Sequence, residues 1–340
     1  MSIPEIILAA LVLVALVSPW SAAEEPAEKK PIRAGIIGLD TSHVMAFTKV
    51  FHEPGAEGYR GRIRVVAGYP GGTDIPASRD RVAKITEELR AAGAEIVDSI
   101  PALLAKIDVV LIESVDGRPH LEQARPVLEA RKPLFIDKPL AGSLADAVAI
   151  FDLAKKLGVP CFSSSSLRFS PGTLGMRNNP GVGDVVGCDA WGPCPLEPTH
   201  PDLFWYGIHG VEMLFTIMGT GCDRVARSQS EDTEIVTGIW KDGRAGVFRG
   251  IRRGKSDYGA MVFGTKGIEP AGGYSGYGPL VEEIAKFFAT GKAPVSPEET
   301  LEIFAFMEAA DESKRKGGQP VSLESVLAKA REAARARGAR

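Results

Sequence analysis

The sequence predicts an α/β protein in which an N-terminal doubly wound parallel sheet is followed by a C-terminal α/β domain with a mostly antiparallel sheet. In the first half of the chain, apolar β-branched runs alternate with helical patterns, and this alternation is typical of a parallel sheet. From residue 183 onward, strand-like runs follow one another with turn residues such as Asp242 and Gly243 between them. Consecutive strands with short turns favour antiparallel pairing.

The expected elements of the first sheet are short apolar strands separated by helices. The strands cover residues 32–37, 63–67, 95–97, 108–112, 133–136 and 159–163. The helices begin at about Ser42, lie around residues 78–92, and cover residues 120–130 and 143–157. Ser143 and Gly158 bracket the last helix as its expected caps, with Asp146 in the first turn.

In the C-terminal half, strands are expected over residues 184–190, 223–229, 233–240, 245–251 and 258–263. Helices over residues 279–289 and 297–316 are apolar on one face and should pack back on the body of the protein. A polar helix is expected from Leu323 to the end of the chain.

The N-terminus has the pattern of a secretory signal peptide. The apolar run Ile6–Val17 is followed by Pro19 and by small residues up to Ala23, and we predict cleavage after Ala23. Residues 24–31 then form a charged linker. These features predict an exported protein, periplasmic or extracellular, with no stable membrane span. An uncleaved N-terminal membrane anchor over residues 3–20 is the alternative.

Composition excludes some classes of partner. The chain has 340 residues, with 40 Lys and Arg against 43 Asp and Glu and a net charge of -3, so no overall basic field would hold a nucleic acid. The four cysteines, Cys161, Cys188, Cys194 and Cys222, are few for a disulfide scaffold, and we expect mostly buried thiols. A bridge between Cys188 and Cys194 is left open. No metal site is predicted.

Residues 108–140 form a strand, a helix and a second strand, and the second strand delivers Lys138 at its end. The residues just past the carboxyl ends of parallel buried strands, here 113–116 and 137–139, line the ligand crevice. Lys138 is therefore the first catalytic candidate. The alternative is a solvated loop lysine paired with Asp137.

Three motifs together make the chain resemble the Gfo/Idh/MocA oxidoreductase family: DKP at residues 137–139, RFSP at 168–171 and GIH at 207–209. The resemblance implies a Rossmann domain for NAD or NADP over residues 32–141, completed by 143–157 and 159–163. It also implies a C-terminal domain for a sugar-like substrate and for homo-oligomerisation over residues 165–320, before the polar helix of residues 321–340.

The resemblance also implies catalytic roles. Lys138 matches the family lysine that contacts substrate and nicotinamide ribose, and His209 matches the catalytic histidine. An imidazole with an ordinary pKa of ~6.5 suits a base that takes a hydroxyl proton while a hydride leaves the same carbon. Trp205 stands where the family has an aspartate, so Tyr206 becomes a candidate proton donor. A core histidine bonded to backbone is the alternative for His209.

Cofactor contacts are expected at the turn after the first strand and at two later strand ends. These residues are Gly35, Gly38, Asp40, Thr41, Ser42, His43, Ser114, His120, Asp137 and Lys138. Asp40 replaces the middle glycine of the usual loop and costs room and charge complementarity beside a diphosphate, unless it turns outward or caps the helix. The segment of residues 68–72 lacks the usual acid for ribose, so NAD versus NADP stays open.

Substrate contacts are expected from Arg168, His200, Asp202 and Trp205, and the Trp205 and Tyr206 rings suit either a carbohydrate platform or core packing. The first hypothesis is an NAD(P)-dependent oxidoreductase acting on a sugar or sugar derivative, with a tightly bound cofactor because an exported protein meets no nicotinamide pool. The alternative is a non-redox sugar-binding protein that kept the fold and lost productive dinucleotide binding.

Overall fold

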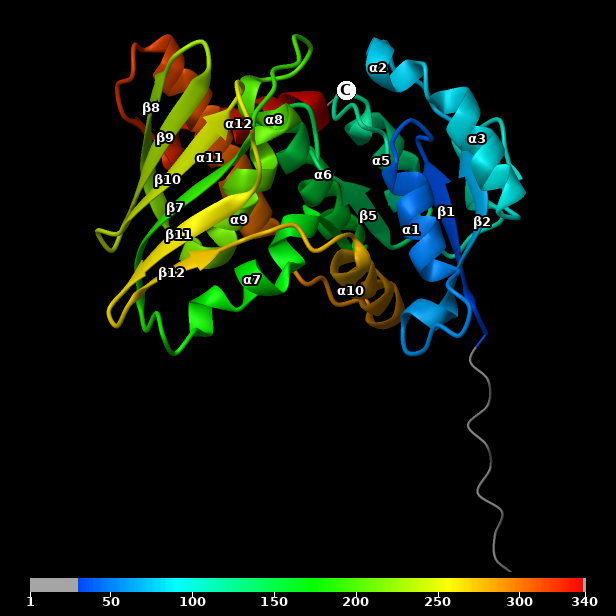
Figure 1. The fold of residues 1–340 in the computed structure, drawn as a ribbon. Helices are drawn as coiled ribbons and strands as arrows, with labels where there is room; N and C mark the ends of the chain where they lie inside the picture. Colours follow the sequence, from blue (N-terminus) through cyan, green and yellow to red (C-terminus); the bar gives the residue numbers. More distant parts are fainter. Residues whose placement is uncertain (1–29, 339–340) are drawn as a thin grey trace, which may run out of the picture. The chain divides into compact units, whose positions relative to one another are not determined.

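The first sheet is parallel, has six strands and runs in the order β3-β2-β1-β4-β5-β6 (Figure 1). In this computed structural model, which describes residues 30–338, the predicted signal peptide and nearly all of the predicted linker lie outside the described residues. The strands are β1 (Ile32–Ile37), β2 (Ile63–Tyr69), β3 (Glu95–Ile96), β4 (Val109–Ile112), β5 (Leu134–Asp137) and β6 (Cys161–Ser164). All four residues of β4, β5 and β6 are buried, as expected for a sheet covered on both faces.

Helices cover both faces of this sheet. The helices are α1 (His43–Phe51), α2 (Pro76–Arg79), α3 (Val82–Ala91), α4 (Ile100–Leu104), α5 (His120–Glu129) and α6 (Leu144–Leu157), with the short η1 (Arg60–Arg62) before β2. A helix from the C-terminal part of the chain, α10 (Gly278–Thr290), packs against α1. The centre of its Phe287 ring lies 4.8 Å from that of Phe162 in β6, so α10 packs on the core of the first sheet.

The second sheet has seven strands in the order β12-β11-β7-β10-β9-β8-β13. The strands are β7 (Val185–Pro193), β8 (Cys222–Gln229), β9 (Thr233–Trp240), β10 (Ala245–Ile251), β11 (Gly259–Gly264), β12 (Ile268–Ala271) and β13 (Val321–Ser322). Its pairs are antiparallel except β7 with β10, which is parallel. The predicted fold class is confirmed: a parallel Rossmann sheet followed by a mostly antiparallel one.

Helices join the two sheets. Between β6 and β12 the chain forms η2 (Ser166–Phe169), α7 (Pro171–Leu174), η3 (Met176–Asn178), α8 (Asp202–Trp205) and α9 (Gly207–Met218). After α10 come α11 (Pro297–Arg315) and α12 (Leu323–Gly338). Every residue of α9 is buried. A Cβ at Gly210 would lie 2.3 Å from the Phe248 ring of β10, so a glycine is needed where this helix presses on the sheet.

The predicted elements differ from the structure at a few places. The helix expected around residues 78–92 is two helices, α2 and α3, which are separated at Asp80 and Arg81. Neither α4 nor β12 was predicted. Helix α9 was not predicted either, because its residues are buried on all sides and show no polar face. All four cysteines are buried and free, so no Cys188–Cys194 bridge is present. Within residues 30–338, no helix is long and apolar enough to cross a bilayer.

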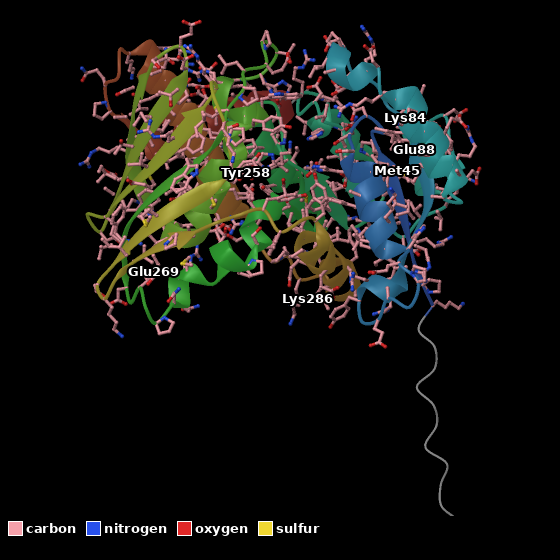
Figure 2. All side chains as sticks on the ribbon, viewed as in Figure 1. Met45, Lys84, Glu88, Tyr258, Glu269 and Lys286 are labelled. Carbon is pink, nitrogen blue, oxygen red and sulfur yellow. The ribbon has the colours of Figure 1, made fainter. Side chains whose placement is uncertain are left out.

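Charged side chains such as Lys84, Glu88 and Glu269 lie at the surface (Figure 2), whereas Arg227 is one of several buried charged residues. The Arg227 side chain is 0% exposed and binds Glu234 at 2.7 Å, Asp311 at 2.5 Å and Asp202 at 2.6 Å. These carboxylates come from β9, α11 and α8, so one guanidinium ties the second sheet to two helices.

We predict that Arg227→Ala destabilises the protein by about 3–5 kcal/mol, because it leaves several carboxylates buried without their cation. Urea unfolding followed by circular dichroism measures the change. The control is Arg224→Ala on the same strand, whose partner Asp223 is exposed and whose loss should cost less than about 1 kcal/mol. Equal effects of the two substitutions would contradict the structural role of Arg227.

Candidate functional site

A cavity of about 160 Å³ opens at the carboxyl end of β5 and is bounded by residues from both halves of the chain. Its lining consists of His43, Lys138, Ser166, Leu167, Tyr206, His209, Tyr258, Tyr274 and Tyr277. The three predicted catalytic residues, Lys138, His209 and Tyr206, therefore meet in one place. They are contributed by the end of β5, by α9 and by the residue just before α9.

Lys138 directly follows β5 and is buried, with 7% of its surface exposed. Its ammonium lies 5.3 Å from the centre of the Tyr206 ring, within the range of a cation–π contact. Burial lowers the pKa of Lys138, while the neighbouring charges of Asp137 and Glu113 act in the opposite direction. The alternative of a solvated loop lysine is wrong, because the side chain points into the protein.

His209 lies in the first turn of α9 and is 8% exposed. Its Nδ1 shares a hydrogen bond of 2.7 Å with the Oγ of Ser165, in the segment that follows β6. Burial, together with the charges of Lys138 and His43, lowers the pKa of His209 well below its ordinary value. The imidazole is therefore neutral at physiological pH and able to accept a proton.

Ser165 is itself fixed by a buried ion pair. Glu212 of α9 accepts hydrogen bonds from the Ser165 amide at 2.8 Å and from Arg168 Nε at 2.8 Å. Arg168 also donates to Glu299 of α11 at 2.8 Å. Arg168, a predicted substrate residue, thus lies beside the cavity segment and binds two carboxylates.

The turn between β1 and α1 has the shape of a dinucleotide-binding turn at its first glycine. Gly38 has φ +87°, and a Cβ there would lie 2.2 Å from the Oγ of Ser114. The N-terminus of α1 begins at His43 with no side-chain cap from Ser42 and no acid in its first turn. Thr41 Oγ1 accepts from the His43 amide at 3.4 Å, and the other amides of the first turn offer backbone donors to an anion. The Gly38 turn and the N-terminus of α1 therefore both fit the diphosphate of a dinucleotide.

Asp40 departs from this pattern. Its carboxylate neither turns outward nor caps α1: it is 2% exposed and accepts a hydrogen bond of 3.0 Å from the Val115 amide, beyond the end of β4. Burial raises the pKa of Asp40 to about 6, although the Val115 amide lowers it. At neutral pH a negative charge therefore lies beside the turn, where it opposes a diphosphate.

Two further carboxylates lie at the carboxyl ends of β4 and β5. Asp137 binds His43 Nδ1 at 2.6 Å. Burial alone would raise the pKa of Asp137, but the charge and hydrogen bond of His43 and the charge of Lys138 hold it below its ordinary value. Glu113 is 0% exposed, and burial and the charges of Asp137 and Asp40 raise its pKa well above the ordinary value.

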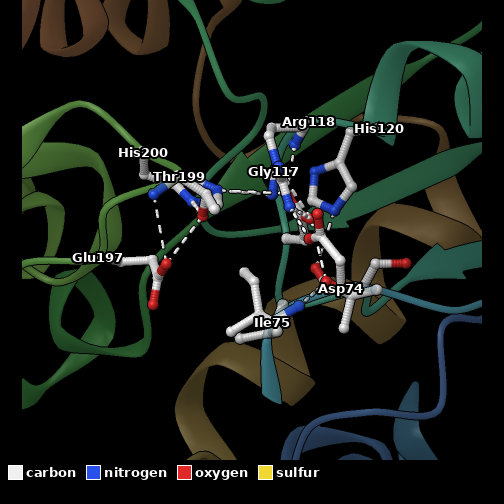
Figure 3. A network of polar contacts seen from close by, with 12 residues as sticks. Asp74, Ile75, Gly117, Arg118, His120, Glu197, Thr199 and His200 are labelled. Atoms are coloured by element: carbon white, nitrogen blue, oxygen red, sulfur yellow. Dashed lines mark hydrogen bonds and ion pairs between the residues drawn. The ribbon is translucent and has the colours of Figure 1, made fainter. Parts of the chain in front are cut away.

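A separate polar network joins the loops after β2 and β4 to residues 197–200 (Figure 3). The Gly117 amide donates to His200 Nε2 at 3.1 Å, so the other ring nitrogen carries the proton and donates to Thr199 Oγ1 at 3.0 Å. Arg118 binds both Asp116 and Asp74, which ties the loop after β2 to the loop after β4. His200, predicted to contact substrate, belongs to this network and does not line the cavity.

The remaining predicted residues have packing or anchoring positions. Asp202 binds Arg227 and Lys314 at the surface side of α8, and Trp205 lies 5.2 Å from the His200 ring. His120 is buried between the carbonyl oxygens of Ser114 and Leu140.

Other predicted cofactor residues pack within the Rossmann half. Ser114 Oγ donates to Gln123 at 3.0 Å, and Thr41 Oγ1 lies 3.4 Å from the His43 amide. Gly35 lies inside β1, where a Cβ would come within 2.9 Å of Ile107.

Three tyrosines of the cavity, and the pairing of His43 with Asp137, were not predicted from the sequence. Tyr274 and Tyr277 come from a glycine-rich segment before α10, and Tyr258 directly precedes β11 (Figure 2). Burial raises the pKa of Tyr258 and Tyr277, so both remain hydroxyl donors at neutral pH. The sequence signal that could have identified these residues is the cluster of tyrosines beside turn glycines.

A larger cavity of about 580 Å³ lies between α6, α11 and α12. None of the predicted site residues lines it, and its walls come mainly from helix side chains. We therefore place the candidate active site in the smaller cavity, where acid–base groups converge.

Comparisons with known proteins agree with this arrangement. Residues 69–165 match the family model GFO_IDH_MocA, described as an oxidoreductase family with an NAD-binding Rossmann fold. This segment contains β4, α5, β5 and Lys138. Over residues 69–165 the chain is therefore similar to the Gfo/Idh/MocA family. The predicted resemblance is thereby confirmed, and among curated proteins none matches the sequence.

Solved structures show that the fold is shared across nearly the whole described chain. A probable dehydrogenase from Thermotoga maritima has 22% identity and a TM-score of 0.71, with coverage of 87% of this chain and 100% of that one. GenD2 from gentamicin A biosynthesis, in complex with NAD, has 16% identity, a TM-score of 0.70 and coverage of 86% and 96%. Scyllo-inositol dehydrogenase from Lactobacillus casei, with bound NAD(H) and scyllo-inositol, has 15% identity, a TM-score of 0.70 and coverage of 87% and 100%.

We predict that the imidazole of His209 titrates well below pH 6.5, because burial and the Lys138 charge disfavour the imidazolium. An NMR titration of the histidine Cε1 protons measures this, and the His209→Gln variant assigns the signal among the five histidines of the chain. A midpoint at or above 6.5 would show that the neutral state inferred for His209 is wrong.

Proposed function

We propose that this protein is an NAD(P)-dependent oxidoreductase that oxidises a secondary alcohol of a sugar, a polyol or a related small molecule. The observation that supports this most is the convergence of Lys138, His209 and Tyr206 in one cavity at the carboxyl end of β5. Rossmann folds bind their cofactor at this edge of the sheet. A bound NAD or NADP would supply the hydride acceptor.

Different residues of the chain would bind the cofactor and act on the substrate. The Gly38 turn and the N-terminus of α1 would hold the diphosphate, and Lys138 would lie at the nicotinamide end. Neutral His209 accepts the proton of the substrate hydroxyl while the carbon loses its hydride. The Lys138 ammonium binds the same oxygen and stabilises the negative charge that develops on it. Tyrosines 258, 274 and 277 surround the cavity and suit a polyhydroxylated ligand.

The choice of substrate class draws on the aromatic lining and on the neighbours. One neighbour in fold is described as an inositol dehydrogenase with its inositol bound. The cavity is small, which favours one ring or part of a ring at the reacting position. NAD and NADP are both compatible with the proposal, because the loop after β2 contains neither the usual ribose acid nor an arginine directly after the strand.

The proposal includes export, which rests on the sequence of residues 1–23 alone. Outside the cytoplasm a nicotinamide cofactor has to arrive already bound and be regenerated in the site by a second half-reaction. Slow release of the cofactor follows from this part of the proposal. A freely exchanging cofactor would contradict it.

The test identifies the small molecules that the purified protein contains. The chain expressed from Glu24 is purified without added cofactor and denatured, and the released small molecules are identified by mass spectrometry. Near-stoichiometric NAD or NADP supports the proposal. No released dinucleotide, together with no binding on titration, overturns it.

With cofactor present, inositols and aldoses are screened for turnover, and Lys138→Met is compared with Lys84→Met, a surface substitution on α3. Loss of the ammonium should lower kcat by about 10²–10⁴, since the oxygen loses its positioned charge. A Lys138→Met variant that weakens only ligand binding would favour a binding protein instead.

A second candidate function is sugar binding without redox chemistry, and the buried charge of Asp40 favours it. Asp40→Asn keeps an acceptor for the Val115 amide and removes the charge beside the turn. If the charge opposes the cofactor, this variant should bind NAD about tenfold more tightly, or ~1.4 kcal/mol, by calorimetry. Asp80→Asn, an exposed carboxylate, is the control.

Unchanged NAD affinity in Asp40→Asn, with wild-type protein that already binds NAD, would remove the reason for the second candidate. Binding that appears only in Asp40→Asn would establish that natural sequence change at this position ended dinucleotide use.

A further inference from the structure

Three potential metal ligands meet at the carboxyl ends of β4 and β5. His43 at the start of α1, Glu113 after β4 and Asp137 at the end of β5 each place one ligand atom within 4.8 Å of the other two. Imidazole nitrogen and carboxylate oxygen are ordinary ligands of Zn²⁺, Mn²⁺ and Fe²⁺. Proximity alone is not sufficient, because acidic groups gather at many protein sites without a metal.

Glu113 supplies the independent observation. Its side chain is fully buried, and among the described residues neither carboxylate oxygen has a hydrogen-bond partner. Leaving a buried carboxyl group without a partner costs several kcal/mol as a general rule. One of these oxygens lies within 4.8 Å of a ring nitrogen of His43 and of an Asp137 oxygen.

The nearby cationic side chains do not pair with the carboxyl group of Glu113. The positive charge of Lys138 acts on Glu113, but the ammonium forms no hydrogen bond with it and lies against the Tyr206 ring. Arg168, another buried cation, is held by Glu212 and Glu299. A dinucleotide would not satisfy Glu113 through its diphosphate either, because both groups are negative.

We propose that His43, Glu113 and Asp137 bind one divalent transition-metal ion, through one imidazole nitrogen and two carboxylate oxygens. The two carboxylates balance the charge of the ion. The present contact between His43 and Asp137, at 2.6 Å, is the arrangement from which both side chains turn toward a shared ion. The inference goes beyond the proposed oxidoreductase function and does not depend on it.

The position of this site beside the cavity indicates a function for the bound ion. His43 lines the same cavity as Lys138 and His209, so the ion borders the space where the substrate would react. Sites with three protein ligands leave positions open for water or substrate. An ion here binds a substrate oxygen and polarises it, next to the Lys138 ammonium.

The test measures metal binding directly. The full chain, without a histidine tag, is treated with EDTA, dialysed and titrated separately with ZnCl₂ and MnCl₂ by calorimetry, and bound metal is counted by plasma mass spectrometry. We expect one equivalent of at least one of these ions. Glu113→Gln, which keeps the shape of the side chain, should weaken binding at least tenfold, and His43→Ala should do the same.

The matched control is Glu308→Gln, because Glu308 of α11 is also a largely buried carboxyl group whose pKa burial raises, outside the cluster. It should leave metal affinity unchanged. Circular dichroism and thermal unfolding show that each variant is folded. Absence of stoichiometric binding of both ions, or equal affinity in wild type and Glu113→Gln, overturns the proposal. Because the readout is bound metal, its failure is separate from a failure to find NAD or NADP.

Discussion

The burial of charged groups at the carboxyl ends of β4 and β5 is the constraint on which the site depends. Burial lowers the pKa of Lys138, and the charges of Asp137 and Glu113 oppose that effect. Asp137 is in turn held by His43, which fixes the start of α1 against the end of β5. Helix α9 then contributes His209, anchored on Ser165, to the other side of the cavity. The carboxyl groups of Asp137 and Glu113 also make the crevice acidic. They therefore affect both cofactor binding and metal binding at this place.

Most of the fold was predictable from the sequence because its strands are short, apolar and rich in β-branched residues. The bounds of β1, β9 and β10 are those predicted, and β2 extends two residues beyond its prediction. Failures occurred where tertiary packing replaces local pattern. The helix α9 is buried on every side, so it lacks the polar face that reveals a helix. The parallel pairing of β7 with β10 depends on connections that local signals do not contain.

The candidate site was predictable where position along a strand defines it. Lys138 follows an apolar run directly, and His209 lies in a recognisable GIH motif, so both were found and both line the cavity. The contact between His43 and Asp137 spans 94 residues and follows from the register of β1 beside β4 and β5, which the sequence does not display. Arg168 was chosen by motif, but its two carboxylate partners come from distant helices. The sequence predicted Glu113 at the crevice, but only the three-dimensional structure shows that its carboxyl group has no hydrogen-bond partner.

A crystal structure of the chain with NAD or NADP tests the central claim most directly, because it locates the nicotinamide ring relative to the groups that would act on the substrate. The account predicts the ring at the carboxyl end of β5, against Lys138, with His209 across the cavity from it and the diphosphate at the Gly38 turn. A dinucleotide bound elsewhere, or a crevice that stays empty at saturating cofactor, would contradict it.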